Sequence, residues 1–120
     1  MRLKVLSGFE GMNLGSYRSR LDIVADILNV ASKGSKGAKK THIMYQANLS
    51  YRLLTRYLSE ILEASLIRFE RKGQCYMLTS KGQMFLEKYK EYSRHNKHVE
   101  QHLNNIRFKR KVLEELCFNE

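Results

Sequence analysis

Apolar side chains recur along this chain with two different periods, and each change of period marks a new structural element. From Ser19 onward the apolar positions follow the i, i+3, i+4, i+7 spacing of an amphipathic helix, and Ser19 with Asp22 has the pattern of a capping box. The apolar positions of this first helix are Ile23, Val24, Ile27, Leu28 and Ala31. Residues 1–17 show no sustained period and are interpreted as an N-terminal extension.

A segment rich in Lys and Gly follows the first helix, and two more helices follow this segment. Residues 32–40 hold four Lys and two Gly and predict a basic loop. Thr41 is the expected cap of a short second helix in which Ile43, Met44 and Ala47 face inward. Asn48-Leu49 predicts a tight turn, and Ser50 is the expected cap of a third helix. The apolar positions of the third helix are Leu54, Tyr57, Leu58, Ile61 and Leu62. This order predicts a helix-turn-helix.

The period changes to two after the third helix. Residues 66–70 alternate apolar and charged side chains, residues 71–74 predict a turn, and residues 75–78 predict a returning strand. The tip of this β-hairpin carries Arg71 and Lys72. Three helices followed by a hairpin predict a winged helix over residues 18–79, in a fold that is mainly α with a small β-hairpin (α+β).

A heptad pattern runs through the last third of the chain. Thr79 is the expected cap of one long helix over residues 80–118, and the absence of Pro from the chain favours such a helix. The seam of this helix alternates spacings of four and three at Phe85, Tyr89, Tyr92, Asn96, Val99, Leu103, Ile106, Arg110, Leu113 and Cys117. Because a monomer would leave the seam in water, the pattern predicts a dimeric coiled coil. The heptads leave parallel and antiparallel pairing open.

Length and charge narrow the function classes. The 120 residues leave room for one small domain with an appended element, and a net charge of +10 favours a polyanionic partner such as nucleic acid. Residues 17–79 contribute +6 of this charge. No apolar run is long enough to cross a membrane, and the first residues are too short and polar for a signal peptide. We therefore expect a cytoplasmic protein without a membrane contact.

Three patterns suggest other chemistry, and each is incomplete. Residues 34–41 resemble a phosphate-binding loop, but Lys39 stands where the motif needs Gly. Three histidines of the last helix lack a carboxylate or Cys to complete a metal site: His95, His98 and His102. The two cysteines are far apart and are expected to be reduced: Cys75 and Cys117. We therefore expect no catalytic residues, metal, cofactor or small-molecule ligand.

Two stretches of the sequence are similar to those of a known family. They are KTHIMYQANLSY at residues 40–51 and YMLTSKG at residues 76–82. With the order of elements over residues 19–118, they resemble the archaeal winged-helix DNA-binding proteins of the Sulfolobus ten-a type. The resemblance implies dimerisation through an antiparallel coiled coil, binding to double-stranded DNA as a chromatin-associated protein or transcription regulator, and an archaeal source. Residues 1–17 have no counterpart in the family.

Winged-helix geometry indicates which residues would contact DNA, because the third helix enters the major groove while cations hold phosphates. The candidates on the third helix are Ser50, Tyr51, Arg52, Thr55 and Arg56. The candidates for phosphate contacts are Lys39, Lys40 and Thr41 at the second helix and Arg71 and Lys72 at the hairpin tip. As alternatives, Tyr51 packs on the second helix, and Arg56 pairs with Glu60 or Glu63.

The leading hypothesis is a dimeric, non-catalytic protein that binds double-stranded DNA. Salt dependence and resistance to competitor DNA separate a sequence-specific regulator from an architectural protein. A hypothesis from a different class is a protein-interaction module, with the coiled coil as its active surface and the winged domain as a docking platform. Acidic residues permit it, at Glu60, Glu63 and Glu70, but the four Lys around the second helix oppose it.

Overall fold

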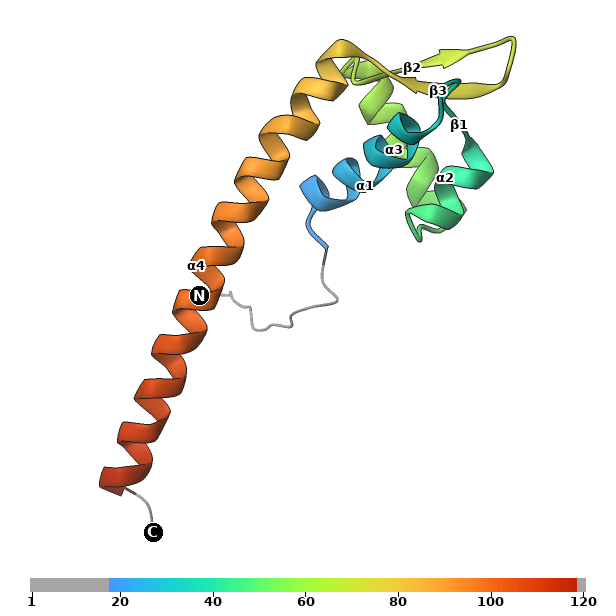
Figure 1. Ribbon diagram of the computed structural model, residues 1–120. Helices are drawn as coiled ribbons and strands as arrows, with labels where there is room; N and C mark the ends of the chain where they lie inside the picture. The colour runs from blue at the N-terminus through green and yellow to red at the C-terminus, as the bar shows by residue number, and fades with distance from the viewer. Residues whose placement is uncertain (1–17, 119–120) are drawn as a thin grey trace. The chain divides into compact units, whose positions relative to one another are not determined.

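The computed structural model describes residues 18–118, so the extension expected over residues 1–17 lies outside the described part. Its elements in chain order are α1 (Arg20–Lys33), β1 (Ala38–Lys39), α2 (Lys40–Gln46), α3 (Tyr51–Glu63), β2 (Ile67–Glu70), β3 (Cys75–Leu78) and α4 (Ser80–Phe118) (Figure 1). This order confirms the expected fold class: a mainly α chain with a helix-turn-helix, a hairpin and a long final helix.

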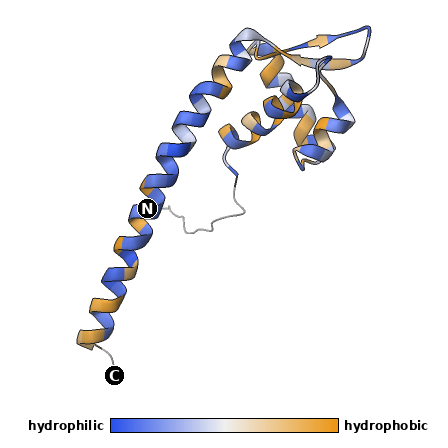
Figure 2. Ribbon diagram, viewed as in Figure 1, coloured by the Kyte–Doolittle hydropathy of each residue, from blue (hydrophilic) through white to orange (hydrophobic). Residues whose placement is uncertain are grey.

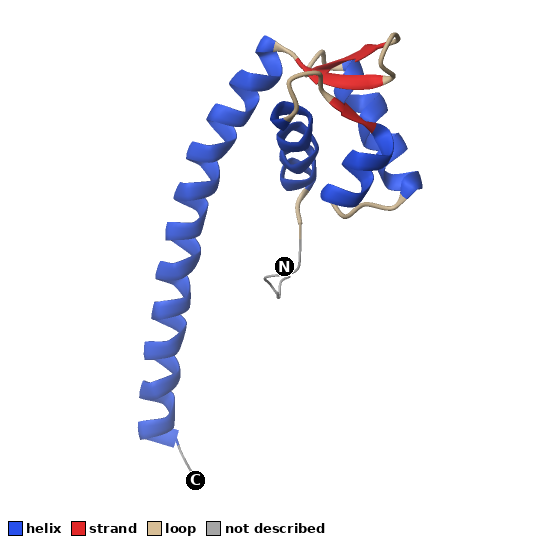
Figure 3. Cartoon of the chain, turned by 45° about the vertical axis from the view of Figure 1, so that its right-hand side comes forward, coloured by secondary structure: helices blue, strands red, loops and turns tan. Residues whose placement is uncertain are grey.

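The strands form a small antiparallel sheet in the order β1-β3-β2. In the hairpin, Ile67 lies opposite Leu78 and Glu70 lies opposite Cys75. Figure 3 shows the three strands together at one end of helices α1–α3. In Figure 1 the turn that joins β2 to β3 projects beyond these helices, as a wing does.

The third strand, β1, corrects the prediction of a basic loop over residues 32–40. Ala38 is buried and pairs with Tyr76 of β3. Gly37, at φ 84°, allows this approach, because a Cβ there would collide with the carbonyl oxygen of Tyr76. A strand of two residues carries no measurable period, so sequence periodicity could not reveal it.

Side-chain cap hydrogen bonds are present at three of the four helix N-termini where the sequence predicts them. The α1 capping box is present: the Asp22 backbone N–H donates to the Ser19 hydroxyl at 3.1 Å, and the Ser19 backbone N–H donates to the Asp22 carboxylate at 3.0 Å. Ser50 accepts from the Leu53 N–H at 3.2 Å, and Thr79 accepts from the Gly82 N–H at 3.0 Å. These bonds satisfy donors that a helix N-terminus otherwise leaves unpaired.

The cap predicted at Thr41 is wrong. α2 begins at Lys40, so Thr41 lies inside its first turn, and Lys39 occupies the N-cap position without a side-chain hydrogen bond. The reason is β1, because Lys39 is already extended, at φ −78° and ψ 156°, when the chain leaves the strand. The strand thus supplies the backbone geometry that an N-cap residue requires.

The described residues divide into two compact units, one up to Leu86 and the other from Glu87 onward. The first unit has its core between the sheet and helices α1–α3. The largest fully buried side chains are Ile27, Leu28, Ile43, Leu54 and Ile67. Each comes from an apolar stripe or strand that the sequence pattern identified.

The turn between α2 and α3 is tied to the segment before α1. Asn48 adopts the left-handed conformation at φ 55°, which places the buried Leu49 between the two helices. The Arg18 guanidinium donates to the Ala47 carbonyl at 2.6 Å and to the Asn48 carbonyl at 2.8 Å. It also pairs with Asp26 at 2.9 Å. Arg18 therefore joins α1 to the helix-turn-helix.

The second unit consists of α4 from Glu87 onward. Figure 2 colours most of this helix as hydrophilic, with hydrophobic bands that become frequent toward its end. Several predicted seam residues are exposed in the single chain: Tyr92, Val99, Leu103, Ile106 and Leu113. No helix within residues 18–118 is long and apolar enough to span a membrane.

Candidate nucleic-acid interface

The junction between α2 and α3 brings a cation and an aromatic ring into contact. The Nζ of Lys40, the first residue of α2, lies 4.1 Å from the ring centroid of Tyr51, the first residue of α3. The Lys40 ammonium lowers the pKa of the Tyr51 phenol, first as a hydrogen-bond donor and then through its charge. The expected packing of Tyr51 on the second helix thus occurs through this contact, while 64% of Tyr51 stays exposed.

Two arginines on α3 are exposed and unpaired within the described residues. Arg52 and Arg56 are one turn apart, and neither makes an ion pair there. The Arg56 guanidinium lies 5.7 Å from the Tyr57 ring centroid.

The alternative pairing of Arg56 with Glu60 is not observed, because Glu60 is already engaged. Its carboxylate pairs with Arg20 of α1 at 2.8 Å. Hydrogen bonds to Glu60 and then to Tyr57 raise the pKa of the Arg20 guanidinium further above its ordinary value. Glu60 therefore neutralises a cation on α1, and neither Glu60 nor Glu63 pairs with Arg56 within residues 18–118.

The other α3 candidates have structural roles as well as exposure. The Thr55 hydroxyl donates to the Tyr51 carbonyl at 2.8 Å, and the Ser50 hydroxyl accepts the cap bond from Leu53. Both side chains are exposed. The Ser50 hydroxyl keeps its O–H to donate to a phosphate or a base edge, whereas the Thr55 oxygen, whose O–H is engaged, can only accept from a base edge.

The candidates outside α3 lie on the sheet and on α2. Lys39 belongs to β1 and lies opposite Cys75 of β3, so it shares the sheet with the wing. Thr41 is exposed in the first turn of α2. Arg71 and Lys72 are exposed in the turn between β2 and β3. The hairpin that carries them is stiffened by the contact of Phe69 with Tyr76, whose ring centroids are 5.0 Å apart.

Sequence reasoning missed two residues of this region. Arg18 holds the α2–α3 turn through long-range contacts that no periodic pattern signals. Tyr45 is 78% exposed on α2, two residues before the start of the α2–α3 connection. The sequence contains a signal for this exposure, because Tyr45 falls outside the apolar positions Ile43, Met44 and Ala47 of this helix.

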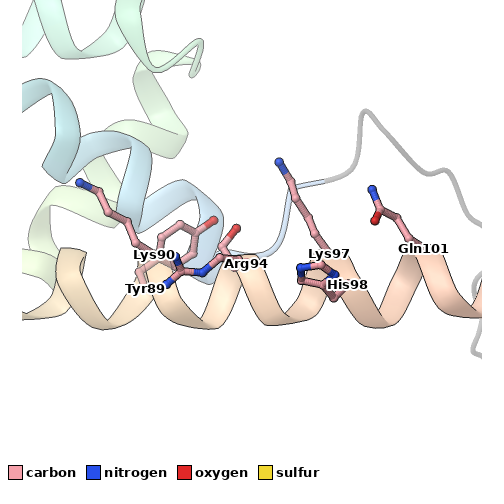
Figure 4. A pocket seen from close by; sticks show the side chains of 7 residues that line it. Tyr89, Lys90, Arg94, Lys97, His98 and Gln101 are labelled. Atoms are coloured by element: carbon pink, nitrogen blue, oxygen red, sulfur yellow. The ribbon is translucent and has the colours of Figure 1, made fainter.

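The predicted histidines of α4 do not assemble into a metal site. Within residues 18–118, no three His, Cys, Asp or Glu side chains gather closely enough to hold a metal ion. Cys75 and Cys117 are free thiols. One of the three histidines, His98, instead lines an open depression on α4 together with six neighbours: Tyr89, Lys90, Ser93, Arg94, Lys97 and Gln101 (Figure 4).

Comparisons with known proteins agree with this geometry. The sequence model of a family described as winged helix-turn-helix matches residues 17–97. The uncharacterized protein MJ0290 of Methanocaldococcus jannaschii is 36% identical over 77 residues, which are 64% of this chain and 35% of that protein. The chain thus spans about a third of the length of this curated relative.

A solved structure shares the fold. It is the crystal structure of Sso10a-2, a DNA-binding protein from Sulfolobus solfataricus, with a TM-score of 0.58 and 18% sequence identity. The match covers 86% of this chain and all of that one. The resemblance to archaeal winged-helix proteins is therefore confirmed. At 18% identity, the match to the solved structure shows a shared fold and not a shared function.

Proposed function

This chain belongs to the winged helix-turn-helix family, and from that premise we propose that it is a non-catalytic protein that binds double-stranded DNA. In this proposal α3 enters the major groove, where side chains near the N-terminus of a helix reach base edges. Cations at the start of α2 and at the wing turn hold phosphates and fix the orientation of the helix. Nucleoid association follows from this binding.

The observation that carries the proposal is a pair of exposed arginines on α3 that form no ion pair within the described residues. Arg52 and Arg56 are exposed one turn apart and have no ion partner within residues 18–118, while Glu60 pairs with Arg20. A free guanidinium can form two parallel hydrogen bonds with the O6 and N7 atoms of guanine, and such a contact contributes about 1 to 3 kcal/mol of discrimination. The same group bound to a phosphate would contribute affinity without sequence preference.

The phosphate contacts are proposed for two places on the winged unit. Lys39 and Lys40 flank the start of α2, and the Lys40–Tyr51 contact fixes one of these cations beside α3. Arg71 and Lys72 occupy the wing turn. Cations on both sides of an inserted helix can bind the phosphates of the two strands that border the groove, and these contacts fix the register of the helix.

A mobility-shift titration over a salt series tests this arrangement. The double variant Arg52→Ala, Arg56→Ala is compared with wild type on random and on selected duplexes. A matched control, Arg107→Ala with Lys109→Ala, removes the same charge from positions on α4 outside the proposed groove contact. We expect a loss of affinity of at least about tenfold in the α3 variant and a small loss in the control. Equal affinities of the α3 variant and wild type would remove α3 from the interface.

The same titration separates two roles that the fold permits, transcription regulation and chromatin architecture. A regulator keeps its complex with a selected duplex in the presence of excess competitor DNA. An architectural protein binds all duplexes alike and loses affinity steeply as salt rises. We propose the architectural role where the slope is the same for every duplex, and the regulatory role where one sequence resists competition.

We further propose that two chains pair through α4. The seam exposes Val99 at 57%, Leu103 at 43% and Ile106 at 48% in the single chain, and they recur at coiled-coil spacing. Burial of such side chains against a second copy is favourable by about 25 cal/mol per Å² of apolar surface. Following the family resemblance, we propose antiparallel pairing, which separates the two winged units and allows them to span one duplex or bridge two.

Sedimentation analysis tests the pairing. The variant Leu103→Glu, Ile106→Glu places charges in the seam and is expected to sediment as a monomer at micromolar concentration. The control Gln101→Glu, Asn104→Glu adds the same charge to positions outside the seam and should remain dimeric. A monomeric wild type would refute the proposed dimer.

A further inference from the structure

A second cationic surface lies on α4, in the unit that begins at Glu87. We propose that Lys90, Arg94 and Lys97 on this surface bind the phosphates of duplex DNA, so that α4 extends the contact made by the winged unit. These three side chains belong to the open depression of Figure 4. The inference rests on the proposed DNA-binding function and adds to it a binding surface on the helix proposed for dimerisation.

The spacing of the three cations suits a row of phosphates. Lys90, Arg94 and Lys97 stand at positions i, i+4 and i+7, which fall on one face of a helix. At about 1.5 Å per residue, Lys90 and Lys97 are about 10.5 Å apart along the helix axis. This distance is close to three base-pair steps of about 3.4 Å along one DNA strand. Figure 4 shows the side chains of Lys90 and Lys97 projecting to the same side of the helix.

The charge of this surface is not neutralised within the protein. Residues 88–111 contain eight Lys and Arg against two Glu. The structure gives no ion pair to Lys90, Arg94 or Lys97 among residues 18–118, although Arg110 of the same helix pairs with Glu114 at 3.3 Å. Cations held this close repel one another, and a polyanion that releases its counterions on binding relieves the repulsion.

The polar side chains around the cations favour DNA over an acidic protein as the ligand. Ser93, His98 and Gln101 line the same depression and can donate hydrogen bonds to phosphate oxygens. The lining contains the rings of Tyr89 and His98 and no aliphatic hydrocarbon side chain. A stable protein interface needs an apolar core, which this surface does not provide.

Dimerisation leaves the three cations of this surface accessible, although Tyr89 at its edge belongs to the seam. At about 100° per residue, Lys90, Arg94 and Lys97 point more than 90° away from the seam positions Tyr92, Asn96 and Val99. A partner helix bound at the seam therefore leaves the cations in solvent. The proposed dimer would carry two such surfaces in addition to its two winged units.

The salt dependence of DNA binding tests the inference. The variant Lys90→Gln, Arg94→Gln, Lys97→Gln is compared with wild type. The control of equal charge loss is Arg107→Gln, Lys109→Gln, Lys111→Gln, in which Lys109 points to the opposite side of α4 from Arg107 and Lys111. Each phosphate contact adds about 0.9 to the slope of log K against log salt, so the first variant should lose about 2 to 3 from this slope. Between about 50 and 200 mM salt, the affinity of the variant should therefore fall by a factor about 40-fold smaller than that of wild type.

The possible results discriminate between the two proposals. The slope loss should be the same for random and selected duplexes and smaller in the control. An unchanged slope, or equal losses in both variants, overturns the α4 surface and leaves the winged-unit contact intact. Absence of DNA binding by wild type overturns both proposals.

A second measurement does not depend on how the variants assemble. Acetylation of Lys90 and Lys97 in wild type should slow when duplex DNA is added, as should that of Lys39. Protection of Lys39 without protection of Lys90 and Lys97 would overturn the inference and support the winged-unit contact alone.

Discussion

The Nζ of Lys40 lies 4.1 Å from the ring centroid of Tyr51, so that a cation of α2 is held over the first residue of α3. This contact couples the two helices of the helix-turn-helix on their exposed side. It also orients Lys40, whose flexible side chain would otherwise lose conformational entropy on binding a phosphate. A preformed contact reduces that cost.

The contact predicts an unusual titration of Tyr51. Because Lys40 lowers its pKa from 10.0, the Tyr51 phenol should ionise at a lower pH than an unperturbed tyrosine. The stabilisation from ionised Tyr51 is complete above pH 10.0 and disappears as the pH falls through the lowered folded-state pKa. Carbon NMR of labelled tyrosines measures this pKa.

Substitution of the cation provides the control for this titration. Lys40→Met should return the pKa of Tyr51 toward 10.0, whereas Lys39→Met should leave it lowered. A lowered pKa that persists in Lys40→Met would show that another group is responsible.

Arg18 and Arg20 predict contrasting effects on stability. Arg18→Ala removes the bonds to Ala47, Asn48 and Asp26, and we expect a loss of about 1 to 3 kcal/mol in the free energy of unfolding. Arg20→Ala removes one exposed ion pair and should change the melting temperature little. Thermal unfolding followed by circular dichroism compares the two variants.

The same pair of variants tests the link from stability to DNA binding. Since Arg18 holds the turn that orients α3, Arg18→Ala should also weaken DNA binding below its melting temperature, and by more than Arg20→Ala, which keeps this turn and only frees Glu60 to pair with Arg56. Equal binding by both variants would limit Arg18 to a role in folding.

Gly82 predicts a steric effect at the start of α4. A Cβ at Gly82 would collide with the carbonyl oxygen of Leu66, and this backbone atom cannot move aside easily. Ala is favoured over Gly in a helix by about 1 kcal/mol, but an overpacked site costs about 1 to 3 kcal/mol, so Gly82→Ala should destabilise the fold. Urea unfolding measures the difference.

Gly73 is the matched control for Gly82. Its added Cβ would lie 3.6 Å from the Cys75 sulfur, which is an ordinary contact, so Gly73→Ala should change stability by less than about 0.5 kcal/mol. Equal destabilisation by both substitutions would contradict the steric explanation.

Oxidation of Cys117 to a disulfide tests the direction of helix pairing. It occupies an inner seam position near the end of α4, so a parallel dimer would place the two Cys117 thiols side by side, while an antiparallel dimer would place them at opposite ends. In a Cys75→Ser background, mild oxidation should therefore give little covalent dimer. Rapid and complete disulfide formation would contradict antiparallel pairing.

The elements with a sustained period could be predicted from the sequence. The stripe of α3 and the alternation in the wing each repeat over several residues, and a repeat reports which face is buried. β1 could not be predicted, since Ala38 and Lys39 are too few to show a period, and their pairing depends on β3, which is remote in sequence. The same strand explains why α2 begins before Thr41.

The residues of the candidate interface could be predicted from the sequence, but which of their charges form ion pairs could not. Exposed cations at the start of α3 follow from the spacing of Arg52 and Arg56. The absence of an Arg56–Glu60 ion pair depends on Arg20, which engages Glu60 from forty positions away. Arg18 was missed for the same reason, because its partners in the α2–α3 turn are about thirty residues distant.

Sedimentation of a fluorescently labelled duplex with increasing amounts of the full chain tests whether the protein binds double-stranded DNA as a dimer, since it measures DNA binding and chain number together. At low salt, we expect the duplex to sediment faster and the mass gained at the first saturable step to equal two chains. A duplex whose sedimentation does not change, or a complex that holds a single chain, would contradict this expectation.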